Sequence, residues 1–365
     1  MKIEELIPKI IQAALNNDRR TIEELSIMII KKLKKTDPEI AAEISSLISI
    51  PNFSSNMRSH AANIPLDRET HFSLVKKREL FEVQAPTLSK ETMDELCDFI
   101  AERKNIDKLI IGGISPPSSI LLLGPPGVGK SHSAEWISNK LELPLITIDL
   151  ATSMSSYLGR SGQNIKTIFD YSRATPSVLF IDELDAIAKK RDDQSDMGEL
   201  KRLVNILLKE MEDWPIHSII LAATNHPDLL DHAIWRRFDR VVNFTLPSKT
   251  ERKIMIENGL ESIIDKIDSQ SLNIVIEQSE GLSGADLERI NMQIRRNLMI
   301  KEESNPNRTL LEIYYKNIDV TDKRAKILLC QTIKKAIPDI SCREITQITK
   351  IPYATVSRYL KEAIE

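Results

Sequence analysis

The chain has 365 residues, 41% of them hydrophobic and 28% charged, a composition typical of a globular protein with two or three domains. No apolar run approaches the ~18 residues of a membrane-spanning helix, and the N-terminus lacks a signal-peptide pattern. Three cysteines without metal-like spacing argue against a disulfide framework and a zinc site, so we expect a reducing cytoplasm and no membrane partner. The net charge of −3 favours no class of ligand.

Residues 1–50 are predicted to form a helical domain. Apolar residues follow a 3.6-residue period between Ile3 and Leu15 and again between Ile22 and Leu33, and Asp37 is the expected N-cap of a third helix. Such a domain either docks a substrate or adaptor or supports a larger assembly, and the amphipathic pattern fits both. Residues 51–86 are polar with little periodicity, so we interpret them as a linker.

Residues 87–247 are predicted to form an α/β subdomain. A helix is expected near 88–104. Apolar strands then alternate with helical patterns, which is typical of a parallel sheet with helices on both faces. The predicted strands are 120–123, 145–149, 178–182, 218–223 and 241–245. Residues 248–318 return to helical patterns.

The most specific motif follows the first predicted strand. Residues 124–131 match G-x-x-x-x-G-K-[ST], the P-loop or Walker A motif, and a helical pattern comes next. In this context backbone N–H groups and the helix N-terminus surround phosphate oxygens. Lys130 is expected to reach the β- and γ-phosphates of ATP, and the Ser131 hydroxyl to bind Mg²⁺. The expected nucleotide contacts in this stretch are Pro125, Pro126, Gly127, Val128, Gly129, Lys130, Ser131 and His132.

Polar side chains end two later strands. Asp182 and Glu183 follow a buried strand like a Walker B motif, where Asp182 would orient Mg²⁺ through water and Glu183 would polarise the attacking water. Asn225 ends the next strand, where it would hold that water from the opposite side. The simpler interpretations are an acidic helix N-terminus for the two carboxylates and a turn before Pro227 for Asn225.

The order of these motifs, followed by Arg236-Arg237-Phe238-Asp239, resembles the AAA+ ATPases over about residues 88–303, and most closely the branch of protein-remodelling unfoldases and severing enzymes. The resemblance implies a P-loop NTPase fold, a helical lid over 248–318 and a homo-oligomeric, hexameric ring. It also implies that Arg236 and Arg237 act as arginine fingers on the γ-phosphate of the neighbouring subunit. Trp235 and Arg236 replace the family's usual Pro-Gly pair, so the choice between the two arginines stays open.

Two further segments resemble the same branch. Gly284 and Ala285 stand in a lid motif whose small residues approach the nucleotide, where other AAA+ branches carry a second sensor arginine. Tyr157, Leu158 and Gly159 resemble the first pore loop, which grips a threaded polypeptide in the family. The simpler interpretation of Tyr157 is an aromatic residue packed at a loop edge.

Residues 320–365 have the spacing of a helix-turn-helix. Residues 322–365 carry nine Lys or Arg against five Asp or Glu, a net charge of +4. Five apolar residues would face inward, and they are Ile345, Ile348, Ile351, Val356 and Leu360. Four residues of the second helix are candidate DNA contacts, and they are Thr355, Ser357, Arg358 and Lys361. Lys350 replaces the usual turn glycine, and the alternative is an accessory hairpin that packs on the lid or on a partner.

The sequence therefore predicts a Mg²⁺-dependent ATPase ring that remodels or threads a protein, with a client protein or a separate protease as its partner. The alternative is an ATP-controlled switch that the C-terminal module anchors on DNA. A nucleotide-binding scaffold without turnover is disfavoured because Glu183, Asn225 and the two arginines are all present.

Overall fold

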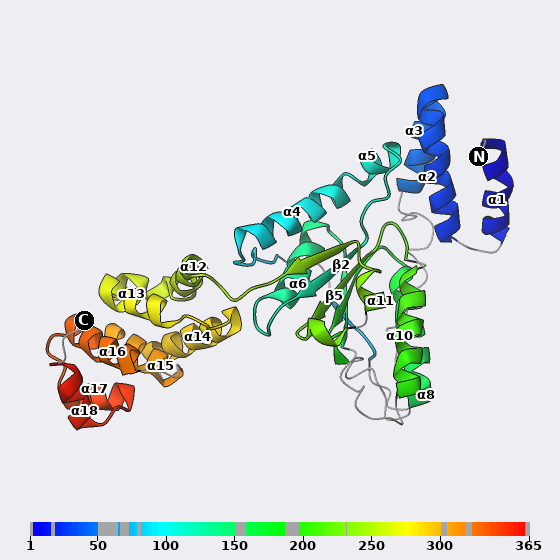
Figure 1. The fold of residues 1–365 in the computed structure, drawn as a ribbon. Coiled ribbons are helices and arrows are strands. Elements are labelled where there is room, and N and C mark those ends of the chain that lie inside the picture. The colour runs from blue at the N-terminus through cyan, green and yellow to red at the C-terminus, as the bar shows by residue number, and fades with distance from the viewer. Residues whose placement is uncertain are drawn as a thin grey trace. The chain divides into compact units, whose positions relative to one another are not determined.

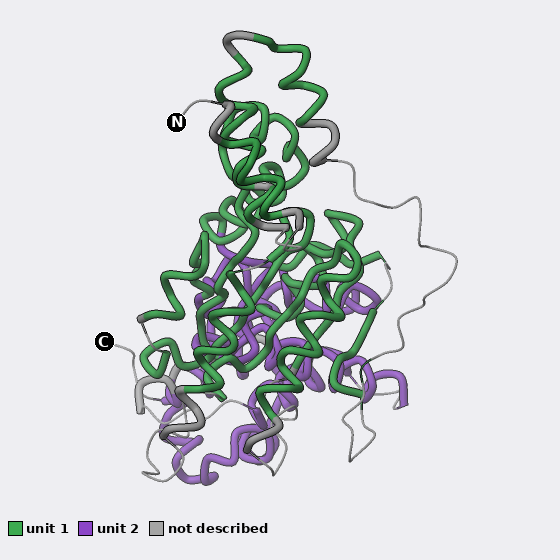
Figure 2. The backbone as a smooth tube through the Cα atoms, turned by 90° about the vertical axis from the view of Figure 1, so that its right-hand side faces the viewer, with its two compact units in different colours: residues 1–86, 90–125, 130–244 green, residues 87–89, 126–129, 245–365 purple. Residues whose placement is uncertain are grey.

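The computed structural model describes most of the chain outside its central linker (Figure 1). The described residues are 3–15, 19–49, 65, 73–78, 82–149, 158–186, 197–212, 214–230, 232–300, 305–317 and 323–361. They form two compact units, coloured separately in Figure 2. The first unit holds the sheet and the N-terminal helices, and the second holds residues 245–365 together with residues 87–89 and 126–129.

A six-stranded sheet of order β1-β3-β4-β5-β2-β6 organises the first unit. Every strand pair is parallel except β1 with β3. The parallel strands are β2 (Ser119–Leu123), β3 (Leu145–Asp149), β4 (Val178–Asp182), β5 (Ile219–Thr224) and β6 (Arg240–Asn243). These bounds confirm the five predicted strands to within two residues at each end.

Helices cover both faces of this sheet, as the sequence predicts. Every residue of β2 and β5 is buried, and successive side chains of a strand point to opposite faces, so neither face is open to solvent. The helices of this region are α4 (Lys90–Lys104), α5 (Ile106–Ile111), α6 (Lys130–Lys140), α8 (Leu158–Arg173), α10 (Met197–Glu212) and α11 (His232–Trp235). A short 3₁₀ helix, Pro227–Leu229, follows β5.

Strand β1 (Lys76–Arg78) lies within the predicted linker, residues 51–86, and the sequence did not predict it. It pairs antiparallel with β3, Lys77 opposite Ile146, at the edge of the sheet. All three of its residues are basic and exposed, so the strand has no apolar alternation that the sequence could reveal. Charged residues are common on edge strands because they oppose unwanted strand pairing. Most of the rest of 51–86 lies outside the described residues.

The N-terminal segment forms the predicted helices, α1 (Ile3–Leu15), α2 (Arg19–Thr36) and α3 (Pro38–Ser49). The side chain of Asp37 accepts a hydrogen bond from the Ile40 N–H at 3.4 Å, in agreement with its predicted capping role. Ile30 of α2 and Ala41 of α3 share a small apolar cluster with Ile110 of α5. These helices therefore pack on the connection that leads into β2.

The second unit is helical. Its helices are α12 (Lys249–Gly259), α13 (Ser269–Gln278), α14 (Gly284–Ile300), α15 (Pro306–Asn317), α16 (Lys323–Ala336), α17 (Cys342–Thr349) and α18 (Tyr353–Tyr359), with a 3₁₀ helix at Glu261–Lys266. One hydrophobic cluster runs from Ile256 of α12 to Tyr359 of α18. The predicted lid and the predicted C-terminal module therefore share a core.

Helices α17 and α18 are two short helices joined by a turn. Lys350 ends α17 in the left-handed conformation, with φ of 59°, which is the conformation usually taken by the turn glycine that it replaces. Ile345, Ile348, Ile351 and Val356 are buried as expected, but Tyr359 takes the fifth inner position and Leu360 is only half-buried. Helix α18 ends at Tyr359, so the helical period that was expected to bury Leu360 stops one residue before it.

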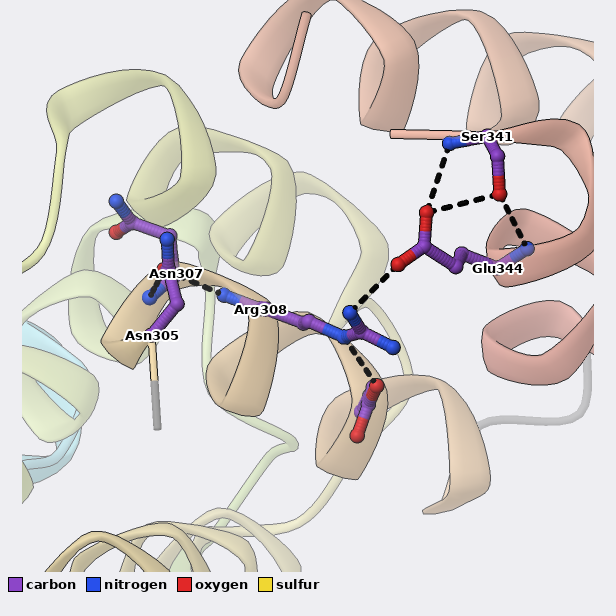
Figure 3. Close-up of polar contacts among 6 residues, drawn as sticks. Asn305, Asn307, Arg308, Ser341 and Glu344 are labelled. Carbon is purple, nitrogen blue, oxygen red and sulfur yellow. Dashed lines mark hydrogen bonds and ion pairs between the residues drawn. The ribbon is translucent and has the colours of Figure 1, made fainter. Parts of the chain in front are cut away.

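A polar network joins α15 to the start of α17 (Figure 3). Arg308 donates from Nε to Glu312 at 2.9 Å and from Nη1 to Glu344 at 2.8 Å. Glu344 also accepts from the Ser341 N–H at 2.9 Å, and the Ser341 hydroxyl accepts from the Glu344 N–H, which completes a capping box. One carboxylate therefore both caps α17 and binds it to α15.

The pKa of Glu344 lies below its usual range, first because it accepts hydrogen bonds from Ser341 and then because Arg308 is near. A carboxyl group with a lowered folded-state pKa stabilises the fold above its unfolded pKa of about 4.3, and that stabilisation is lost as the pH falls through the folded value. We therefore expect Glu344→Gln to lower the urea midpoint of unfolding at pH 7, and the difference from wild type to shrink below about pH 4. Glu280→Gln, at an exposed position, is the control. Equal differences at pH 7 and pH 3 would refute this role.

Candidate functional site

The carboxyl ends of three adjacent strands carry the predicted chemistry. Strand β5 lies between β4 and β2 in the sheet. The P-loop follows β2, Asn225 follows β5, and Asp182 ends β4 with Glu183 behind it. Because these strands run parallel, all three ends meet at one edge of the sheet, which is where open α/β sheets bind ligands.

Lys130 is the centre of this edge. Its ammonium donates to the carbonyl oxygens of Gly124 and Pro125 at 2.6 and 2.8 Å, and to Asn225 Oδ1 at 2.7 Å. The residue is 7% exposed, and burial lowers its pKa, while Asp182 and Asp185 oppose that change. The predicted P-loop lysine and the predicted Asn225 are thus in direct contact, although they are far apart in the sequence.

Two glycines of the loop have conformations that a larger residue would not tolerate. Gly127 has φ of +77°. A Cβ on Gly124 would lie 2.2 Å from the carbonyl oxygen of Phe244, which follows β6. Glycine at these two positions allows the loop to take this conformation next to the end of the sheet. Val128 is buried, whereas Pro126, Gly127 and His132 are exposed and free to face a ligand.

Ser131 and Asp182 form the donor set expected for Mg²⁺. The Ser131 hydroxyl, in the first turn of α6, donates to Asp182 Oδ2 at 3.2 Å. A hydroxyl and a carboxylate oxygen at this separation fit a hard cation with oxygen ligands, so these two residues would hold Mg²⁺. The other oxygen of this carboxylate, Asp182 Oδ1, accepts a hydrogen bond from the Glu183 N–H at 2.9 Å, which helps to fix the orientation of the carboxyl group.

Glu183 has a strained backbone. Its φ is 52°, which is unusual for a residue with a Cβ. The bond from its N–H to Asp182 and the bond from the Leu184 N–H to the Ala223 carbonyl, at 2.9 Å, hold the segment in place. The side chain is exposed. Strain of this kind is concentrated at functional sites, where surrounding contacts impose it.

Asp185 is a site residue that the sequence reasoning missed. It is 2% exposed, and its Oδ1 accepts from the Thr224 hydroxyl at 3.0 Å and from the Asn225 N–H at 3.3 Å. It therefore connects the segment after β4 to the end of β5. The available signal was a third carboxylate, Asp185, two residues beyond Glu183 at the end of a buried strand.

Arg236 and Arg237 lie at the opposite end of the sheet from the P-loop. Asp239 accepts from the Ser118 N–H at 2.7 Å and the Ser119 N–H at 2.9 Å, where β2 begins. The P-loop begins where β2 ends, about 13 Å further along the strand. Both arginines are exposed.

The two arginines differ in their partners. Arg237 forms an ion pair with Glu212 of α10, and its carbonyl oxygen accepts from the Ser119 hydroxyl at 3.3 Å. Arg236 has no ion pair with any residue in the described part of the chain. This asymmetry was not visible in the sequence, where the two arginines are adjacent and equivalent.

Within the second unit, the predicted lid motif contacts the tip of the P-loop. The Ala285 N–H donates to the Gly127 carbonyl oxygen at 3.0 Å. A Cβ on Gly284 would lie 3.3 Å from the same oxygen, so a small residue is needed there. Asp286 accepts from the Ser283 hydroxyl at 2.7 Å, and this bond is the main reason that its pKa lies below the usual range.

The other predicted site residues belong to other segments of the chain. Tyr157 lies outside the described residues, and Leu158 and Gly159 begin α8. Of the candidate DNA contacts, Arg358 and Lys361 are exposed, whereas Thr355 and Ser357 are half-buried. Arg358 also lies over the ring of Tyr359, 5.4 Å from its centroid. In the described segments no helix has the length and apolar content to cross a membrane.

Comparison with known proteins identifies the domain that carries this site. Residues 120–246 match the family model described as ATPase family associated with various cellular activities (AAA). An uncharacterized AAA family ATPase of Sinorhizobium fredii is 35% identical over 214 residues, which are 59% of this chain and 64% of that protein. A proteasome-activating nucleotidase of Methanocella arvoryzae is 34% identical over 215 residues, 55% of this chain and 51% of the relative. The chain thus spans between half and two thirds of these curated relatives.

A solved structure supports the same fold. The AAA domain of FIGL-1 superposes with a TM-score of 0.56 at 20% identity, covering 76% of this chain and 99% of that domain. The chain therefore carries an AAA ATPase domain.

Proposed function

We propose that this protein hydrolyses ATP in an oligomeric ring and uses the turnover to remodel a protein substrate. The observation that carries the proposal is the contact of Lys130 with Asn225 beside the Ser131–Asp182 pair. Lys130 would bind the β- and γ-phosphates, and Ser131 and Asp182 would hold Mg²⁺, which neutralises phosphate charge when bound. Glu183 would accept the proton of the attacking water while Asn225 orients that water.

Asp185 is proposed as a positioning residue for Asn225. Its carboxylate fixes the backbone of Asn225 and the hydroxyl of Thr224 from inside the protein. It does not reach the reacting atoms itself, so it would act only through the placement of the Asn225 amide. The effect on turnover should therefore exceed the effect on nucleotide binding.

The position of the arginines supports a ring. Because Asp239 fixes Arg236 and Arg237 at the opposite end of β2 from the P-loop, they cannot complete the nucleotide site of their own chain. An arginine finger from an adjacent subunit would stabilise the charge that develops in phosphoryl transfer. Arg236 is the proposed finger because Arg237 is already paired with Glu212.

The substrate class rests on the relatives and on one segment of sequence. The name of the M. arvoryzae relative describes activation of a proteasome, which is a protein-degrading partner. Residues 157–159 resemble the aromatic pore loop of the same branch. The proposed substrate is therefore a polypeptide that is threaded through the ring, and the proposed partner is a separately encoded protease. Tyr157 is the proposed contact with the threaded polypeptide.

The form of α17 and α18 supports a second candidate function. The two helices and the left-handed turn at Lys350 follow the helix-turn-helix arrangement, and Arg358 and Lys361 are exposed on the second helix or just after it. In this alternative the ring is a switch that is anchored on duplex DNA, and ATP controls its assembly. The two candidates differ in what stimulates turnover.

Replacing Asp185 should separate catalysis from binding. We expect Asp185→Ala to lower kcat by about tenfold or more, the usual cost of removing an outer support of a site, with a much smaller change in the Kd for ATP. Asp185→Asn keeps an acceptor oxygen and should be milder. Asp228→Ala, at an exposed position beyond β5, is the control. Equal losses of binding and turnover, or a collapse of the melting temperature, would indicate a purely structural carboxylate.

Subunit mixing should reveal the arginine finger. Arg236→Ala should reduce ATPase turnover by on the order of 10³-fold, whereas Arg237→Ala should cost less. Mixing Arg236→Ala subunits with Lys130→Ala subunits should restore activity above that of either protein alone, since some interfaces then contain one intact site. If mixed oligomers form, as shown by differently tagged subunits, and activity does not rise, Arg236 does not act in trans.

The ATPase rate measured with an unfolded polypeptide, and separately with duplex DNA, should decide between the candidate functions. We expect an unfolded polypeptide to raise the ATPase rate of the full chain severalfold and duplex DNA to leave it unchanged. Glu183→Gln should lower the rate by ~100-fold in both cases, because it removes the general base. Stimulation by DNA alone would favour the switch, and near-normal turnover in Glu183→Gln would contradict the catalytic assignment.

A further inference from the structure

A second pocket lies in the C-terminal part of the second unit, among α15, α16, α17 and α18. Its volume is about 360 Å³, which lies in the range of small-molecule sites. It opens beside the turn between α17 and α18, and its walls include Ile351, Pro352 and Tyr359. All of its lining residues belong to one unit, so the pocket does not depend on how the two units are arranged.

Three lysines from three different elements line this pocket. Lys316 comes from the end of α15, Lys326 from the start of α16 and Lys350 from the turn after α17. Among the lining residues that the structure describes there is no Asp or Glu. Within the described ranges none of the three lysines forms an ion pair, although Lys253, Lys249 and other surface cations do. Mutual repulsion of unpaired cations is unfavourable, which an anionic ligand would relieve.

The pocket lining also includes Thr355, whose side chain carries a hydroxyl group. Tyr315 lines the pocket as well, but its own hydroxyl oxygen is enclosed by protein and is not a contact for a ligand there.

We infer that this pocket binds a phosphate-bearing small molecule. A phosphate group carries about two negative charges near neutral pH and presents three acceptor oxygens, enough for three ammonium groups from separate directions. The apolar wall formed by Ile351, Pro352 and Tyr359 can cover the organic part of the ligand. The site is distinct from the nucleotide site at the P-loop, and it does not depend on the proposed function.

The pocket is also distinct from the candidate DNA surface. Arg358 and Lys361 are not among the lining residues, and only Thr355 belongs to both sets. A concave site of this volume accommodates one phosphorylated group with its substituent, whereas duplex DNA presents phosphates on a convex surface. A phosphorylated small molecule would contact both the lysines and the apolar wall, whereas a DNA backbone would contact the lysines alone. The small molecule therefore fits the lining of the pocket better.

Titration with inorganic pyrophosphate tests the site in the full chain. The background is Lys130→Ala, which removes the main phosphate contact of the P-loop, so failure of the ATPase proposal does not affect the result. We expect saturable binding by calorimetry in this background. Combining Lys316→Gln, Lys326→Gln and Lys350→Gln should weaken that binding at least about tenfold, since three charge-assisted contacts are removed.

The matched control makes the same change of charge elsewhere, at Lys104, Lys266 and Lys335, which are exposed and lie outside the pocket. Three outcomes would overturn the proposal. They are no binding of pyrophosphate, equal weakening of binding by the triple control variant, and binding of duplex DNA without binding of pyrophosphate. The melting temperature of each variant verifies that it is folded.

Discussion

The position of β5 between β2 and β4 determines the geometry of the nucleotide site. It places Asn225 between the P-loop and the acidic strand end, within 2.7 Å of the Lys130 ammonium. The spacing between neighbouring strands is nearly constant, so groups at the ends of three adjacent strands lie within about 10 Å of each other. The burial of β2 and β5 on both faces fixes those ends, and Asp185 adds a direct bond between two of them.

This arrangement explains why motifs predicted so much of the site. The P-loop, Asp182, Glu183 and Asn225 each follow a strand whose apolar run is visible in the sequence, and parallel strands bring their ends together. Fold class, strand bounds and the contact of Lys130 with Asn225 follow from that pattern. The helix-turn-helix spacing of residues 342–359 had the same kind of local signal, and Lys350 took the left-handed conformation of the missing glycine.

The features that the sequence did not predict depend on contacts between distant residues. Strand β1 has only Lys77 and its two basic neighbours, and it forms by backbone pairing alone. Asp185 acts through Thr224, 39 positions later, and the pairing of Arg237 with Glu212 depends on α10. Similarly, the three pocket lysines are separated by up to 34 positions and become neighbours only when α15, α16 and the turn pack together. Periodicity within a segment contains no information about such pairs.

The anchoring of the arginine segment by Asp239 has a mechanical consequence. The same five-residue strand holds the P-loop at one end and, through Ser118 and Ser119, the arginine segment at the other. A fully buried strand between parallel neighbours is stiff along its length, so a displacement at one end is transmitted to the other with little loss. In a ring of the proposed kind, β2 would couple the P-loop of one subunit to its arginine segment. A shift of the P-loop on nucleotide binding would then move the arginine that enters the active site of the next subunit.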